Sequence, residues 1–393
     1  MLRLWLAISL TVSLIVFVPK AGLLANGVQP DTQIAAILNS NQYDIQNEGR
    51  KFLIREAVKN DFFLLGELHG DNEIPVLLSV LWPEMWKQGY RHIAAELSPW
   101  AAHQLEFVPA GQGRPGIQTL WTKQEAEAVH ALADSKTSVL WGCDMEEEQP
   151  QFLIRTLSSL NPADSNLTAM VEMTRHGYKR ENAPDLLALA ERSNTTVDEG
   201  INDVSLRENL LATLKIDANR SSAETKMIAQ NDRELLMKDQ FLKHYRRDSA
   251  TAKTKVLFRF GRNHLHRGYD ARGISTLGNF IAEFAISESK KAFNVGAFGA
   301  GGTASLVGGT WNADERNDEP AFMLLAEKAR YSATLYDLRP LRALLHRIPA
   351  EKRSPMQANL MYWADSYDAL ICYKNVTPLA LQRPPSHASS GNK

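Results

Sequence analysis

The chain has 393 residues, and 44 Lys and Arg residues nearly balance 45 Asp and Glu residues, which gives a formal net charge of −1. This balance argues against a nucleic-acid partner, because proteins that bind nucleic acids through a groove carry a basic excess. Hydrophobic residues make up 44% of the chain and charged residues 23%, which excludes a wholly disordered, collagen-like or polytopic membrane protein. A single core rarely grows beyond about 250–300 residues, so the length favours one large domain that carries an insertion.

Residues 1–25 are typical of a secretory signal. Arg3 precedes a mostly apolar run, residues 4–18, and a proline, a lysine and small residues follow it. The run is shorter than the roughly 20 residues that a membrane-spanning helix needs, which favours cleavage near Ala25. An uncleaved segment that ties the chain to a membrane is the alternative. We therefore expect an exported protein, periplasmic or secreted.

Six short apolar runs are typical of strands buried on both faces, as in a sheet that is covered by helices. They are residues 62–65, 92–97, 138–142, 255–261, 293–298 and 368–372. Helical periodicity separates the first three, for example over residues 73–88, where Pro83 predicts a kink or a break. This alternation predicts an α/β fold with a mixed, mostly parallel central sheet flanked by helices.

Helical periodicity becomes almost unbroken from about residue 146 to 252, and is clearest in residues 183–192, 204–216 and 223–247. We interpret this region as a helical insertion within one α/β domain, residues 26–381. Residues 382–393 combine Pro with several Ser and are expected to form a disordered tail. The two cysteines, Cys143 and Cys372, lie in apolar runs, so two buried thiols are favoured over a disulfide bridge between them.

Ionisable residues cluster where the first predicted strand ends, in the stretch Gly66-Glu67-Leu68-His69-Gly70-Asp71. In open α/β sheets, ligands bind beyond the carboxyl ends of the strands. If the chain stays extended, Glu67 and His69 lie on one face, where the carboxylate can orient the imidazole. Asp71 or Asn72 is expected to cap the helix that follows.

The next two strands also end in acidic residues. Glu96 ends the second predicted strand and Asp144 follows the third. A carboxylate at such a place must find a partner or shift its pKa, which makes both residues candidates for the site. The acidic run at residues 146–148 is interpreted as the solvated start of a helix.

The fourth predicted strand leads into Gly261-Arg262-Asn263-His264-Leu265-His266. Two histidines at this spacing serve as metal ligands, as a base and its helper, or as one functional and one surface residue. We favour His264 over His266. Arg262 is a candidate for stabilising developing negative charge, and an exposed arginine in a salt bridge is the alternative.

Other motifs argue against common enzyme classes. Residues 299–304 fit a dinucleotide-binding glycine pattern only nominally, since no convincing helix follows them, and a glycine-rich loop is favoured. The chain has no Walker-type phosphate loop, no Gly-x-Ser-x-Gly and no His-Glu-x-x-His, which disfavours nucleotide hydrolysis and the common serine-hydrolase arrangement.

In these motifs the sequence resembles a superfamily that joins the erythromycin esterases, the ChaN-like haem-binding proteins and the TraB/Tiki proteases. The matching elements are Gly66-Glu67-Leu68-His69, Ala95-Glu96, Gly261-Arg262-Asn263-His264-Leu265 with a small-residue-rich helix over residues 273–284, and Arg233-Glu234-Leu235-Leu236-Met237. They cover residues 60 to 285 in the right order. Erythromycin esterases have one more residue between the Glu and the His, so this spacing is closer to the ChaN and Tiki branches.

The resemblance implies a hydrolase-like pocket, or a pocket that holds haem. The first hypothesis is an exported hydrolase of an ester or amide bond in a small molecule or peptide. His69, oriented by Glu67 or Glu96, would take a proton from water, and Arg262 would stabilise the oxyanion. His264 would protonate the leaving group or help bind a metal.

Two kinds of cofactor follow from these hypotheses. A divalent metal, manganese, cobalt or zinc, would be held by His69, His264 and Asp144. The second hypothesis is a haem or iron carrier, for which His264, His266 or Tyr269 would supply an axial ligand.

Overall fold

The computed structural model describes residues 29–107, 121, 125, 128–129, 131–132, 138–147, 149–194, 205–249, 254–306 and 309–379. The predicted signal, residues 1–25, and the predicted tail, residues 382–393, lie outside these ranges. Within the ranges, helices long and apolar enough to cross a membrane are absent.

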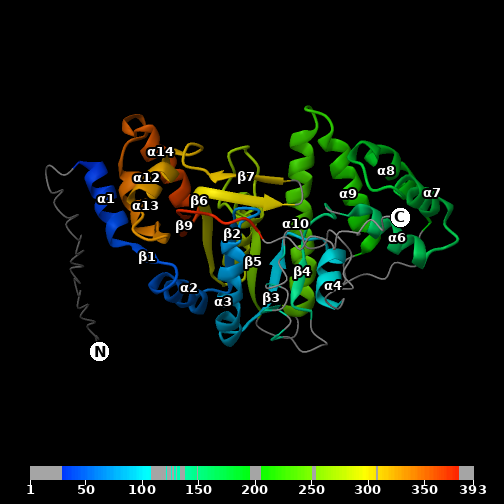
Figure 1. The fold of residues 1–393 in the computed structure, drawn as a ribbon, viewed down its shortest axis with the longest axis horizontal. Helices are drawn as coiled ribbons and strands as arrows, with labels where there is room; N and C mark the ends of the chain where they lie inside the picture. Colours follow the sequence, from blue (N-terminus) through cyan, green and yellow to red (C-terminus); the bar gives the residue numbers. More distant parts are fainter. Residues whose placement is uncertain are drawn as a thin grey trace, which may run out of the picture.

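A nine-stranded sheet of the described residues forms the centre of the molecule, in the order β1-β8-β9-β6-β2-β5-β3-β4, with β7 paired to β6 (Figure 1). The strands are β1 (Gln42–Asp44), β2 (Phe62–Glu67), β3 (Tyr90–Ala95), β4 (Leu140–Gly142), β5 (Lys255–Gly261), β6 (Ala292–Leu306), β7 (Gly309–Asp314), β8 (Ala333–Asp337) and β9 (Ala369–Tyr373). Neighbours from β9 to β4 are parallel, whereas β1 with β8, β8 with β9 and β6 with β7 are antiparallel. This confirms the mixed, mostly parallel sheet, and each of the six predicted runs overlaps a strand.

Helices cover both faces of the sheet. They are α1 (Pro30–Ser40), α2 (Glu48–Lys59), α3 (Glu73–Lys87), α4 (Pro99–Phe107), α6 (Pro150–Leu160), α7 (Ser165–Met173), α8 (Ala183–Arg192), α9 (Leu206–Arg220), α10 (Lys226–Ser249), α11 (Leu277–Ser287), α12 (Pro320–Lys328), α13 (Arg339–Arg347) and α14 (Pro355–Ser366), with short 3-10 turns η1 (Arg180–Asn182), η2 (Arg262–His264) and η3 (Ala350–Lys352). Phe63 and Leu65 of β2 pack against α2 and α3, whereas Phe62 and Leu64 pack against the opposite layer, which includes α10 and α11. Because both faces are buried, the central strands are continuously apolar.

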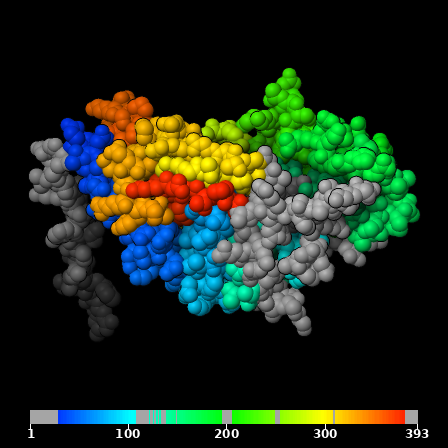
Figure 2. Space-filling model, in the orientation of Figure 1, coloured from blue at the N-terminus to red at the C-terminus, as the bar shows by residue number. Residues whose placement is uncertain are grey.

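The helical insertion is confirmed, since α6 to α10 all lie between β4 and β5 in the chain. Helices α6 to α9 form one end of the molecule, and α1 lies with α12 and α13 at the other end (Figures 1 and 2). Helix α3 continues through Pro83, so the predicted break is absent. Asp71 accepts a hydrogen bond from the backbone N–H of Ile74 at 2.8 Å, as expected of a residue that caps this helix.

The predicted glycine-rich loop at residues 299–304 is wrong, because these residues belong to the long strand β6. The pairing with β7 shifts register between Ala300 and Thr303, which marks a bulge. Gly302 has φ +91°, and a side chain there would come within 2.1 Å of the carbonyl oxygen of Val376. Glycine therefore permits a bulge and a close backbone approach here.

Both cysteines are free and buried, which confirms the favoured interpretation. Cys143 follows the edge strand β4, whereas Cys372 lies in β9 on the other side of β2.

Candidate functional site

Four of the predicted site residues come together at the carboxyl ends of adjacent parallel strands. Glu67 ends β2, Glu96 follows β3, Asp144 follows β4, and His264 lies in η2 directly after β5. Since β2, β5, β3 and β4 are neighbours, their carboxyl ends meet at one edge of the sheet.

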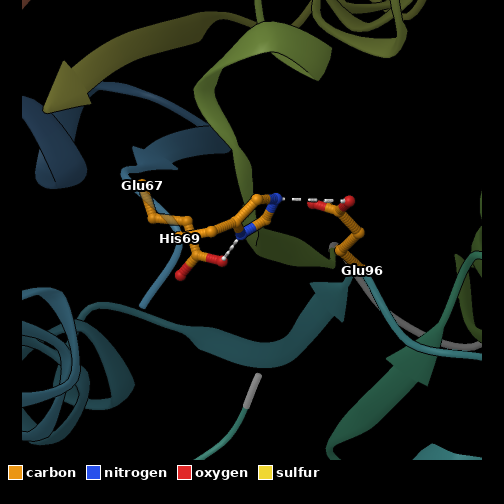
Figure 3. Close-up of side chains that lie close together, drawn as sticks. All are labelled: Glu67, His69 and Glu96. Carbon is orange, nitrogen blue, oxygen red and sulfur yellow. Dashed lines mark hydrogen bonds and ion pairs between the residues drawn. The ribbon is translucent and has the colours of Figure 1, made fainter. Parts of the chain in front are cut away.

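His69 lies between two carboxylates (Figure 3). Its Nδ1 is 2.9 Å from Oε1 of Glu67, and its Nε2 is 3.7 Å from Oε1 of Glu96. The His69 side chain is 36% exposed, whereas the side chains of Glu67 and Glu96 are 4% and 3% exposed. Gly261 makes room for the ring, because a Cβ at this position would lie 2.7 Å from Nε2.

Glu96 is the centre of the cluster. Its Oε1 is 2.9 Å from Nη2 of Arg233 and 3.4 Å from Nε2 of His264, and its Oε2 accepts a hydrogen bond from the N–H of Gly261 at 2.6 Å. Burial alone would raise the pKa of Glu96, but the positive charge on His264 and His69 outweighs burial and holds this pKa well below its usual value. Glu96 is therefore ionised near neutral pH.

The two histidines have different surroundings. His264 is buried, and its Nδ1 makes a short hydrogen bond with Oε1 of Glu234 while its Nε2 faces Glu96. Burial lowers the pKa of His264, but Glu96 and Glu234 outweigh burial and raise it to about 10. For His69, burial is likewise outweighed by Glu96 and Glu67, so its pKa is also raised above 6.5. His264 is therefore a cation at neutral pH, and His69 is the more exposed histidine.

Asp144 binds Arg233, which reaches the site from α10. The guanidinium donates to Oδ1 of Asp144 at 3.0 Å and also contacts Oε2 of Glu147 at 2.9 Å. Burial raises the pKa of Asp144 in spite of Arg233. The prediction that the acidic run is solvated is wrong for Glu146. This residue is buried, and its carboxylate accepts a hydrogen bond from the hydroxyl of Ser98. Glu148 lies outside the described residues.

The sequence motifs did not predict that Arg259 belongs to the site. It points from β5 to Glu67, with Nη2 2.9 Å from Oε2, and its Nε is 2.8 Å from Oε1 of Glu125. The guanidinium also lies 5.0 Å from the ring centroid of Trp121. An arginine in the middle of an apolar strand must find buried partners, and this signal could have revealed it.

Arg262 is not brought to the cluster. Its Nη1 donates to the carbonyl oxygen of Ala297 and to Oε2 of Glu315, both at 2.8 Å. Its guanidinium also lies 5.2 Å from the ring centroid of Phe322. Arg262 therefore forms a salt bridge with Glu315, as the alternative interpretation expects. Its side chain is mostly buried, whereas that interpretation expects an exposed one.

A cavity of about 310 Å³ opens beside His69. It is lined by His69, Glu96, Leu97, Ser98, Ala101, Asp144, Met145, Glu146, Glu147, Arg233 and Leu306. A larger cavity, about 430 Å³, lies between α2, α3 and the start of β8, and none of the predicted site residues lines it.

Glu67, His69 and Glu96 each offer one ligand atom within 4.8 Å of the others, a geometry that could hold a metal ion. Of the three predicted metal ligands, only His69 belongs to this group. The Glu67 carboxylate already binds Arg259, and the Glu96 carboxylate binds Arg233 and a backbone N–H. Because guanidinium groups already supply the positive charge and occupy these oxygens, the residues fit a divalent metal poorly.

Family models and curated proteins give no match to the sequence. A solved protein from Bacillus cereus is 14% identical, with a TM-score of 0.57, over 91% of this chain and 100% of that chain. A mutant of erythromycin esterase EreC in its open conformation is 13% identical, with a TM-score of 0.54, over 85% of this chain and 94% of that chain. The fold is similar to that of erythromycin esterase. The resemblance predicted from the motifs is thus confirmed at the level of the fold.

ChaN of Campylobacter jejuni, solved with cofacial haem, is 16% identical, with a TM-score of 0.30, over 63% of this chain and 85% of that chain. A likeness this weak supports no argument about function.

Proposed function

We propose that the chain is a hydrolase of an ester or amide bond in which His69 takes a proton from the attacking water. The observation that carries this proposal is the exposure of His69 to the cavity while two buried carboxylates flank its ring. A general base must reach its water and must be held in one orientation, and His69 meets both conditions. The similar fold of an erythromycin esterase supports a hydrolase-like pocket.

Each buried group supports the base in a different way. Glu67 accepts the Nδ1–H of His69, which leaves the lone pair of Nε2 for a water molecule. Arg259 holds the other oxygen of Glu67. Once His69 has taken the proton, the charges of Glu67 and Glu96 stabilise the imidazolium.

His264 and Arg233 supply positive charge. With a pKa of about 10, His264 is a poor proton donor at neutral pH, so its role here is electrostatic and not that of the general acid expected from the sequence. Arg233 lines the cavity and is better placed than Arg262 to stabilise an oxyanion.

The test is a panel of nitrophenyl esters and aminoacyl amides assayed with the wild-type chain and the His69→Asn variant. We expect the variant to lose at least about a hundredfold in rate, as is usual when a general base is removed. His176→Asn is the matched control, because His176 is exposed on the helical insertion. A wild-type rate in His69→Asn excludes the proposed base.

We propose no haem carrier, because none of its three candidate ligands lines the cavity beside His69. Both ring nitrogens of His264 face carboxylates. His266 is buried, and its Nδ1 lies 3.1 Å from the hydroxyl of Tyr362. Tyr269 is 65% exposed.

We also propose that the protein is exported, on the basis of residues 1–25 alone. Cell fractionation with sequencing of the mature N-terminus tests this proposal, and we expect a new terminus near Asn26. Full-length chain in the cytoplasm would contradict it.

A further inference from the structure

Two adjacent residues of α10 enter the site from the helical insertion. Arg233 reaches Oε1 of Glu96 at 2.9 Å. Glu234 binds Nδ1 of His264, whose Nε2 faces the same oxygen of Glu96 at 3.4 Å. The four side chains thus form a chain of polar contacts that begins and ends on α10.

Both oxygens of Glu234 are in use. Its side chain is fully buried, and Oε1 contacts Nδ1 of His264. The Oε2 accepts a hydrogen bond of 2.8 Å from the N–H of Leu277, the first residue of α11. A backbone N–H can only donate, so this bond fixes the rotation of the carboxylate and directs the other oxygen to His264.

We infer that Glu234 is a positioning residue, which fixes the ring of His264 with both of its N–H groups directed at carboxylates. Glu234 does not line the cavity beside His69. It acts through His264, which lies between it and Glu96. The predicted effect on rate rests on the proposed hydrolase function, whereas the effect on the ring of His264 does not.

The Glu234→Gln variant tests this role with little change of shape. In Gln an NH₂ donor replaces one of the two carboxylate oxygens, so the bond from either Leu277 or His264 loses its acceptor. We expect kcat to fall about 10- to 100-fold, by analogy with the loss that follows when a residue that orients a metal-binding histidine is replaced. We expect KM to stay within about twofold, since Glu234 does not contact the substrate. Glu283→Gln, an exposed substitution on α11, is the matched control.

Nitrogen NMR of chain labelled with ¹⁵N-histidine gives a readout that needs no substrate. The signals of His264 are assigned by their loss in His264→Asn. In the wild type we expect both ring nitrogens to carry protons near neutral pH, and in Glu234→Gln we expect one to lose its proton.

Unchanged His264 signals together with a wild-type kcat in Glu234→Gln would overturn the inference, even if His69→Asn is inactive. Should Glu234→Gln fail to fold, Glu234→Asp replaces it, because the shorter side chain cannot span both partners. Wild-type His264 signals in that variant would overturn the inference as well.

Discussion

Nε2 of His264 lies 3.4 Å from Oε1 of Glu96, and this contact separates the roles of the two histidines in the site. His264 is buried and forms ion pairs with both Glu96 and Glu234. His69 lies 3.7 Å from the same oxygen but is exposed to the cavity. The positive charge of His264 lowers the pKa of His69, but Glu96 and Glu67 outweigh this effect and the pKa is raised overall.

The rate should depend on the protonation of His69. Its pKa is raised above 6.5 because Glu96 and Glu67 outweigh burial, and the base works only when neutral. We therefore expect kcat/KM to fall as the pH drops through a value above 6.5. Glu96→Gln removes the largest cause that raises the pKa of His69. The fall of kcat/KM at acidic pH should therefore move to lower pH in this variant. If kcat/KM falls at the same pH in Glu96→Gln as in the wild type, a group other than His69 is titrating.

The stability of the protein should depend on pH through His264. Its folded pKa of about 10 lies above the ordinary value of 6.5, so the ion pairs favour the folded state fully below 6.5. This contribution is lost progressively as the pH rises toward about 10. We expect the wild type to lose stability over this range relative to His264→Asn in chemical denaturation. Parallel pH profiles for the two proteins, with His176→Asn as control, would contradict the assignment.

Arg259 should contribute to stability by pairing with Glu67. Arg259→Met removes the guanidinium that pairs with two buried carboxylates, Glu67 and Glu125, and removal of one partner of a buried ion pair costs about 3–5 kcal/mol in comparable cases. Denaturant unfolding measures this loss. Arg175→Met removes an exposed ion pair with Glu172 and should cost at most about 1 kcal/mol. Equal costs for the two variants would argue against a buried pair.

A methyl group at position 261 should disturb the base without disturbing the backbone. Gly261 has φ −50°, which alanine adopts readily, but its Cβ would lie 2.7 Å from Nε2 of His69. Gly261→Ala should therefore displace the ring and lower kcat at least about tenfold, since misplacement of about 1 Å is costly in catalysis. The thermal midpoint serves as the control for folding. A wild-type kcat in this variant would mean that the ring of His69 is not held as described.

Much of the site was predictable from sequence, because the carboxyl ends of parallel strands meet at one edge. Glu67, Glu96, Asp144 and His264 all lie at or just beyond the carboxyl ends of apolar runs, and the sheet brings them together. Arg262 occupies the same kind of position, but its side chain turns to Glu315. Position after a strand does not determine where a long side chain points.

The contributions of α10 were not predictable. The motif that contains Arg233 and Glu234 was recognised, but their contacts depend on how the insertion packs against the sheet, which no local pattern encodes. The antiparallel edge was missed for a related reason. Strand β1 has only three residues, and its pairing with β8 joins distant parts of the chain.

Chemical rescue of His69→Ala tests the central claim most directly. This variant should lose at least about a hundredfold in kcat, and free imidazole in the buffer should restore part of the rate, because the cavity leaves room for a base beside the attacking water. His176→Ala should keep the wild-type rate without imidazole. A His69→Ala variant with wild-type kcat would contradict the account.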